Sequence, residues 1–164
     1  MRSLTQAAIA ASLICGSTDR TFSAQVQTQI DGETCRLVWQ GDERIEISFS
    51  RSRGLLKSAV NIRVNECSFS FDGFYVVFNG EREDYTSRSV TAEAGRNSVR
   101  VTHLLDHPRL LSPIRVVIRV WLSEHDKALR FEAETDNGPS LHLDRLGVGN
   151  HQGSGLSPRR MFSR

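Results

Sequence analysis

The stretch Pro113-Ile-Arg-Val-Val-Ile-Arg-Val-Trp-Leu-Ser-Glu-His-Asp-Lys-Ala-Leu-Arg-Phe-Glu-Ala-Glu-Thr135 decides the fold. Side chains alternate across a β-strand, so an apolar residue at every second position predicts one buried face. Both arms of the stretch show this alternation, and a short polar segment separates them, which predicts an antiparallel hairpin. The inward residues are Ile114, Val116, Ile118, Val120 and Leu122 on the first arm, and Leu129, Phe131 and Ala133 on the second.

The opposite face of this hairpin mixes one indole with charged groups. Matching the buried faces fixes the register, because a slip by one residue would turn every side chain over. Trp121 then lies opposite Arg130, and Arg119 lies opposite Glu132. An indole can stack on a sugar ring while charged groups bind hydroxyls or uronate carboxylates. The alternative is structural, with Arg130 stacked on Trp121 and Arg119 paired with Glu132. The candidate ligand-binding residues are Arg115, Arg119, Trp121, Arg130 and Glu132.

Short alternating segments recur along the rest of the chain, which has 164 residues and suits one domain with a substantial core. No convincing amphipathic helix follows residue 24. About ten short strands with Asp-Gly, Asn-Gly and Pro turns predict an all-β fold, an antiparallel β-sandwich over residues 25–150 with little or no helix apart from the N-terminal leader. The polar, Gly-containing sequence after residue 150 predicts a flexible or truncated tail over residues 151–164.

Two Asp-Gly dipeptides predict two-residue turns between paired strands. We expect a type I′ hairpin at Asp31-Gly32 and a second hairpin at Asp72-Gly73, whose strands would bury an aromatic cluster. A change of the apolar face within residues 142–148 predicts a β-bulge near Arg145. The expected cross-strand pairs are Val26 with Leu37 and Thr28 with Cys35 in the first hairpin, and Phe71 with Phe74, Phe69 with Val76 and Cys67 with Phe78 in the second.

Residues 1–24 have the pattern of a secretory signal peptide, because Arg2 precedes a short apolar run that ends at Cys15. The run is too short for a membrane-spanning helix, and a disordered or amphipathic N-terminus is the alternative. Export would place the protein in the periplasm, at the cell surface or outside the cell. Cys35 and Cys67 would remain, and an even pair in an exported chain suggests a disulfide, with two free buried thiols as the alternative.

The titratable residues give only weak catalytic candidates. His103, Asp106 and His107 could ligate a metal or transfer protons if the strand end brings them together. We favour a structural role, with His103 in the core and the other two in a turn before Pro108. Serine-nucleophile, phosphate-loop, zinc and calcium motifs are absent from the sequence. We therefore expect no metal and no cofactor. We favour a protein without catalysis over an enzyme.

Charge gives one further candidate and excludes one class of partner. The 21 basic and 19 acidic side chains are spread along the sequence, without the one-sided basic concentration typical of nucleic-acid binding. The polar loop at residues 50–54 carries Arg51 and Arg53 and suits either an anion site or a solvated turn. We favour the solvated turn.

Residues 112–150, with the runs Pro-Ile-Arg-Val-Val-Ile-Arg-Val-Trp-Leu, Lys-Ala-Leu-Arg-Phe-Glu-Ala-Glu-Thr-Asp and Leu-Asp-Arg-Leu-Gly-Val-Gly-Asn, resemble strands of the large β-sandwiches in secreted polysaccharide-processing enzymes, including galactose-mutarotase-like modules. None of the catalytic residues of those enzymes maps onto this chain. The resemblance implies an exported, non-catalytic β-sandwich that binds carbohydrate or supports a carbohydrate-active partner. The alternatives are a fragment or shortened form of a polysaccharide lyase or hydrolase, and an envelope or adhesion module whose sheet edges pair with protein. The oligomeric state stays open.

Overall fold

The computed structural model describes residues 4–5, 25–41, 43–78, 85–107, 111–123, 128–135, 143–149 and 151–154. These ranges contain thirteen strands and no helix, which confirms the predicted all-β class. In the part of the chain that is described, no helix has the length and apolar character needed to cross a membrane. The strands are β1 (Leu4–Thr5), β2 (Gln25–Asp31), β3 (Thr34–Gln40), β4 (Arg44–Ser50), β5 (Val60–Val64), β6 (Cys67–Phe71), β7 (Phe74–Phe78), β8 (Thr86–Ala94), β9 (Ser98–Asp106), β10 (Ile114–Ser123), β11 (Ala128–Thr135), β12 (Leu143–Val148) and β13 (His151–Ser154).

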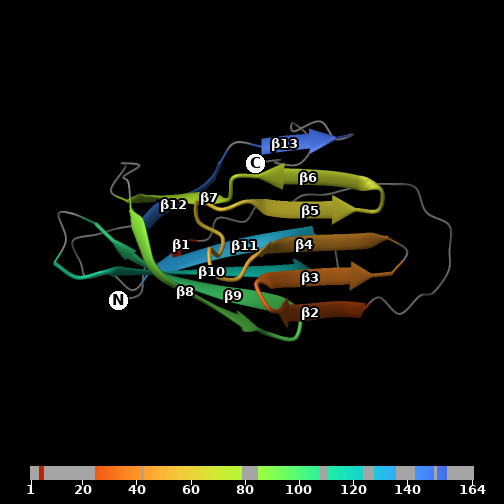
Figure 1. Ribbon diagram of the computed structural model, residues 1–164, viewed down its shortest axis with the longest axis horizontal. Coiled ribbons are helices and arrows are strands. Elements are labelled where there is room, and N and C mark those ends of the chain that lie inside the picture. The colour runs from red at the N-terminus through yellow and green to blue at the C-terminus, as the bar shows by residue number, and fades with distance from the viewer. Residues whose placement is uncertain are drawn as a thin grey trace.

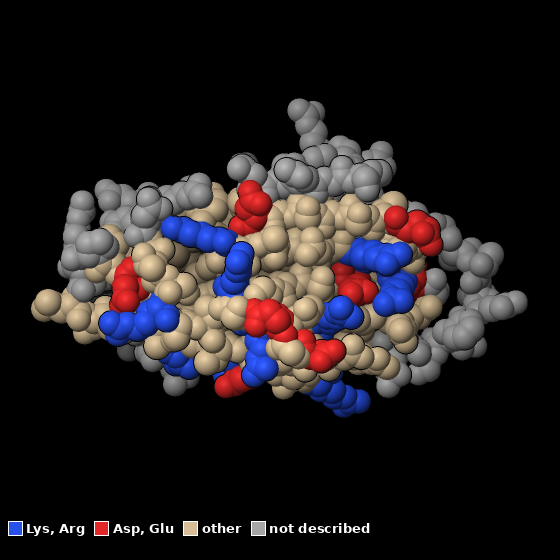
Figure 2. All heavy atoms as spheres, viewed as in Figure 1, with Lys and Arg blue, Asp and Glu red and all other residues tan. Residues whose placement is uncertain are grey.

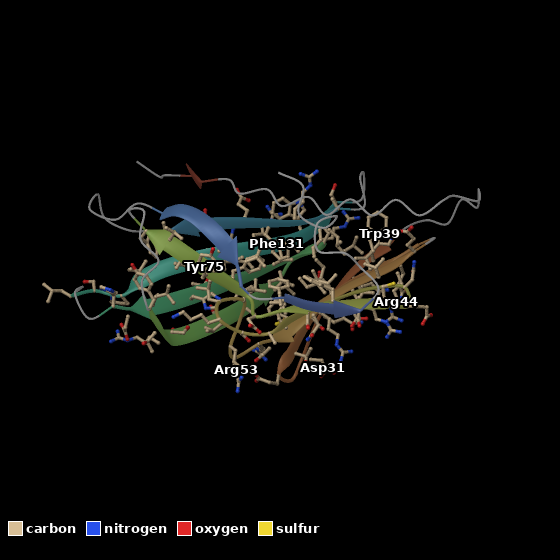
Figure 3. The ribbon with its side chains drawn as sticks, turned by 90° about the horizontal axis from the view of Figure 1, so that it is seen from above. Asp31, Trp39, Arg44, Arg53, Tyr75 and Phe131 are labelled. Carbon is tan, nitrogen blue, oxygen red and sulfur yellow. The ribbon has the colours of Figure 1, made fainter. Side chains whose placement is uncertain are left out.

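The strands form two large antiparallel sheets and one small one (Figure 1). The six-stranded sheet has the order β13-β6-β5-β4-β3-β2, and the five-stranded sheet has the order β1-β11-β10-β9-β8. Strands β12 and β7 form a two-stranded sheet. Figures 1 and 3 show the two large sheets as stacked layers, and one cluster of buried residues draws on both. The fold is therefore a β-sandwich.

The central hairpin, β10 and β11, forms as predicted. Its register pairs Trp121 with Arg130 and Arg119 with Glu132. All eight residues expected on the inward face are buried. Phe131 reaches across the core, where its ring centroid lies 4.7 Å from that of Phe74 on β7. Because each fully buried apolar side chain contributes on the order of 1.5–3 kcal/mol, this hairpin supplies a large part of the core.

The first hairpin, β2 and β3, forms with a different turn from the one predicted. Asp31 pairs with Thr34, so the two loop residues are Gly32 and Glu33, and Thr28 lies opposite Leu37 instead of Cys35. Gly32 has a φ of +51°, whereas Glu33 is not among the residues with positive φ. A type I′ turn needs positive φ at both positions, so the predicted turn type and pairs were wrong. The two-residue shift preserves which side chains face inward.

The second predicted hairpin does not exist. Strand β6 pairs with β5 on one edge and with β13 on the other, while β7 pairs with β12. Asp72-Gly73 is therefore a crossing between two sheets, where Phe74 N–H donates to the Leu55 carbonyl at 2.8 Å. The aromatic cluster itself is buried as expected, with the Phe71 and Phe74 rings 5.2 Å apart, edge to face. Contact between the rings did not require the strands to pair.

The end of the chain contains the predicted bulge and one further strand. The pairing of β12 with β7 shifts between Leu143 and Arg145, which confirms the predicted bulge. Residues 151–154, within the predicted tail, form strand β13, which pairs with β6. Residues 155–164, and all of the predicted leader except residues 4–5, lie outside the described residues.

Candidate functional site

The predicted ligand-binding residues share the outer face of the five-stranded sheet. We call Arg115, Arg119, Trp121, Arg130 and Glu132 the Trp121 face. Strand β10 carries the first three and β11 carries the last two, with side chains that alternate with the buried set. The register extends onto β9, where Ser98 lies opposite Trp121. The structure thus brings the predicted residues onto one surface.

The indole of Trp121 is half-buried and has a cation stacked on it. The guanidinium carbon of Arg119 lies 5.3 Å from the ring centroid. This distance is within the range of about 6 Å in which the ring face attracts a cation. The structural alternative placed Arg130 over this ring and paired Arg119 with Glu132. The part of the chain that the structure describes holds no ion pair between Arg119 and Glu132, so the Arg119 guanidinium serves the indole instead.

A row of four charged residues crosses the same face. Glu93, Arg100, Arg119 and Glu132 are successive partners on β8, β9, β10 and β11. The two arginines at the middle of the row lie directly opposite each other, and like charges in that position destabilise a sheet. Each of these arginines also lies opposite a glutamate, Glu93 or Glu132, at the ends of the row.

His103 is a core residue with one hydrogen bond. Its side chain is fully buried, and its Nε2 accepts a hydrogen bond from Leu55 N–H at 3.3 Å. An accepting Nε2 leaves the proton on Nδ1, which is buried without a partner. Burial lowers the pKa of His103 from 6.5 to about 4, because the charged form cannot be solvated there. The imidazole is thus neutral at pH 7.

The other two weak catalytic candidates contact different parts of the fold. Asp106 accepts an ion-paired hydrogen bond from Arg88 at 3.1 Å, and both side chains are about half exposed. The ring of His107 contacts the ring of Tyr85 at a tilt of 43°, with centroids 5.0 Å apart. In the described ranges, no group of three or more His, Cys, Asp and Glu side chains is placed to hold one metal ion.

The two cysteines after the predicted leader are free, so the suggested disulfide is not formed. Cys35 on β3 and Cys67 on β6 belong to one sheet and are separated by β4 and β5. Three strand spacings of about 4.8 Å separate them by at least about 14 Å, twice the reach of a disulfide. Cys35 is fully buried, and desolvation raises the pKa of its thiol. Cys67 is partly exposed.

Sequence reasoning missed a pocket of about 450 Å³ on the side of the sandwich. It lies between the 51–59 loop, strand β7 and the edge strand β8. The one available signal was the pair of arginines in that loop, which the sequence alone could not distinguish from a solvated turn. In the structure the two arginines differ, because Arg53 lines the pocket and Arg51 does not.

Charges of both signs are interspersed on the side of the molecule where the six-stranded sheet lies (Figure 2). Together with the sheets and sites above, this defines a β-sandwich with two distinct candidate binding surfaces. In comparisons with known proteins, no family model matches the chain, and no curated protein and no solved structure matches it either.

Proposed function

We propose that this protein is an exported, non-catalytic β-sandwich that binds carbohydrate through the Trp121 face. The observation that supports this best is a partly exposed indole on a sheet face, held by a guanidinium and surrounded by further charged side chains. Sugar rings bind by placing their apolar faces on aromatic rings and their hydroxyls on charged or polar groups.

The contact between Arg119 and Trp121 prepares the face for a ligand. A stacked guanidinium limits the rotation of the indole, so less side-chain entropy is lost when a ligand binds. Arg115 and Arg119 are exposed and can donate to ligand oxygens. The opposition of Arg100 and Arg119 favours an acidic sugar, because a uronate carboxylate between them would offset their repulsion.

The test is a glycan array followed by calorimetric titration of the glycans that bind. We expect Trp121→Ala to weaken binding roughly tenfold, as loss of one aromatic stack predicts. Arg100→Gln should weaken binding of uronate-containing glycans and leave neutral glycans unchanged. Arg36→Gln is the matched control, since Arg36 is an exposed arginine on the outer face of the other large sheet. An array without binding, or a folded Trp121→Ala protein that binds as tightly as wild type, would overturn the proposal.

One observation favours a second candidate, an adhesion module whose sheet edge pairs with protein. Among the described strands, β8 pairs only with β9, and the side chains of its first four residues, 86–89, are exposed. An open edge can accept an added strand from a partner. Under this alternative, proline substitutions in β8 would abolish partner binding, and Trp121→Ala would leave it unchanged.

A further inference from the structure

We propose that the pocket beside β8 binds an organic anion with an apolar body, and we call it the β7–β8 pocket. Its volume of about 450 Å³ lies within the usual range for small-molecule sites, about 300–1,000 Å³. It is formed by three segments distant in sequence, namely the 51–59 loop, β7 and β8. This site is separate from the Trp121 face, which lies on β10 and β11.

The inner lining of the pocket is apolar. Five of the lining residues are buried members of the core cluster. The inner wall of the pocket is therefore made by the outermost atoms of core side chains. A hydrocarbon or aromatic group placed there would be stabilised by about 25 cal/mol for each Å² of apolar surface that it removes from water. These residues are Leu56, Phe74, Val76, Tyr85 and Leu105.

The rim of the pocket is positively charged. Arg53, Lys57 and Arg88 line it, and among the described lining residues there is no Asp or Glu. The charge of Arg88 is partly neutralised by Asp106, and Lys57 Nζ donates to the Tyr85 carbonyl at 3.3 Å. For the Arg53 guanidinium, the described residues provide no ion-pair partner. Figure 3 shows this side chain extending outward from its loop. An anion at the rim would therefore meet a net positive field.

Backbone contacts hold the loop wall of the pocket in place. Lys57 N–H donates to the Phe74 carbonyl at 3.0 Å, and Lys57 has a φ of +50°, which is uncommon for a residue with a side chain. At the start of the loop, the Ser52 N–H donates to the Glu33 carboxylate at 3.0 Å. The cations at positions 53 and 57 are thus carried on a preformed loop, which lowers the cost of ordering them on binding.

An apolar interior with a cationic rim selects for ligands that have both parts. We expect a carboxylate on a hydrocarbon or aromatic body to bind, and the corresponding alcohol and amine to bind far more weakly. Lipid acids and aromatic acids share this chemistry. Decanoate and 4-phenylbutyrate represent the two sources.

The experiment titrates the full chain with 4-phenylbutyrate, 4-phenylbutanol, 4-phenylbutylamine and decanoate, followed by calorimetry and by amide chemical shifts. Binding of either carboxylate, with shifts in β8 and the 51–59 loop and weakening at higher salt, supports the site. Arg53→Gln and Lys57→Gln should each lower affinity roughly tenfold, in keeping with the loss of one hydrogen bond to a charged group.

Controls separate this site from general surface effects and from the Trp121 face. Arg36→Gln removes an exposed arginine outside the pocket, and Trp121→Ala removes the indole of the Trp121 face. Both variants should bind the carboxylate like wild type. Equal binding of the alcohol or the amine, absence of binding by both carboxylates, or unchanged affinity in both the Arg53→Gln and Lys57→Gln proteins would each overturn the proposal. Arg53 is exposed, so its variant should fold normally.

Discussion

At the scale of single residues, His103 makes the stability of the core depend on pH. Its imidazole lies between β9 and the 51–59 loop, where Nε2 accepts from Leu55 N–H and Nδ1 has no partner. The folded protein therefore binds a proton at this site less readily than the unfolded chain does. The difference in proton binding becomes a difference in stability.

We predict that wild type loses about 3 kcal/mol of unfolding free energy through His103 as the pH falls from about 6.5 to about 4. Above this window the imidazole is neutral in both states, so it adds no pH dependence. Within the window the unfolded chain is protonated and the folded protein is not, which favours unfolding. Urea titrations at several pH values measure the effect.

The control variant for this prediction is His103→Gln, whose amide oxygen can still accept the Leu55 N–H hydrogen bond. The pH dependence of wild type minus that of the variant isolates His103 from the carboxylates. Parallel stability curves for the two proteins between pH 6.5 and 4 would contradict the assignment.

At the scale of elements, the 51–59 loop packs against the core through a glycine. Gly54 has a φ of +68°, and a Cβ at this position would lie 2.4 Å from Cε1 of His103. Gly32, in the β2–β3 turn, has a φ of +51° but no atom within 4 Å of such a Cβ. The two glycines thus share a backbone requirement and differ in their surroundings.

We predict that Gly32→Ala costs about 1 kcal/mol, the cost of placing a side chain at positive φ. Gly54→Ala should cost about 1–3 kcal/mol more, because the added methyl overlaps a buried ring in a packed core. Denaturant unfolding of both variants gives the comparison. Equal destabilisation would mean that the loop moves away from His103 at little cost.

The elements also show what the sequence could and could not predict. The β10–β11 hairpin was predictable down to its register, because both arms alternate and a short segment joins them. The strands on either side of Asp72-Gly73 show equally clear alternation, yet they belong to different sheets. Strand β13, the second partner of β6, and strand β12, the partner of β7, come from the far end of the chain, and no local pattern reports such pairings.

The candidate sites follow the same division. The Trp121 face was predictable because it depends on one local hairpin and its alternation. The β7–β8 pocket was not, because its walls come from a loop and two strands that only the complete fold brings together. The stacking of Arg119 on Trp121, two residues along one strand, needed side-chain conformations that the pattern does not contain.

At the scale of the whole molecule, aromatic rings join the layers. Phe131 of the five-stranded sheet contacts Phe74 of β7, and Phe74 contacts Phe71 of the six-stranded sheet. All three side chains are buried, so the chain of rings crosses the core from one large sheet to the other.

We predict that Phe131→Ala lowers the unfolding free energy by about 3–5 kcal/mol, through lost burial and the cavity left between the sheets. Leu111→Ala is the control, because Leu111 is fully exposed and should change stability by less than about 0.5 kcal/mol. Thermal and denaturant unfolding measure both. A loss below about 1 kcal/mol for Phe131→Ala would show that the layers close over the missing ring.

The order of strands in the two large sheets bears on how the chain is synthesised. Strands β2 to β6 are neighbours in both sequence and sheet, and so are β8 to β11. A ribosome that has translated residue 71 has therefore delivered five adjoining strands of one layer before β8 to β11 of the other layer are translated. Strand β13 joins this layer only at the end, so the edge of β6 stays open during elongation. That edge is one point at which a nascent chain of this protein would be exposed to aggregation or to a chaperone.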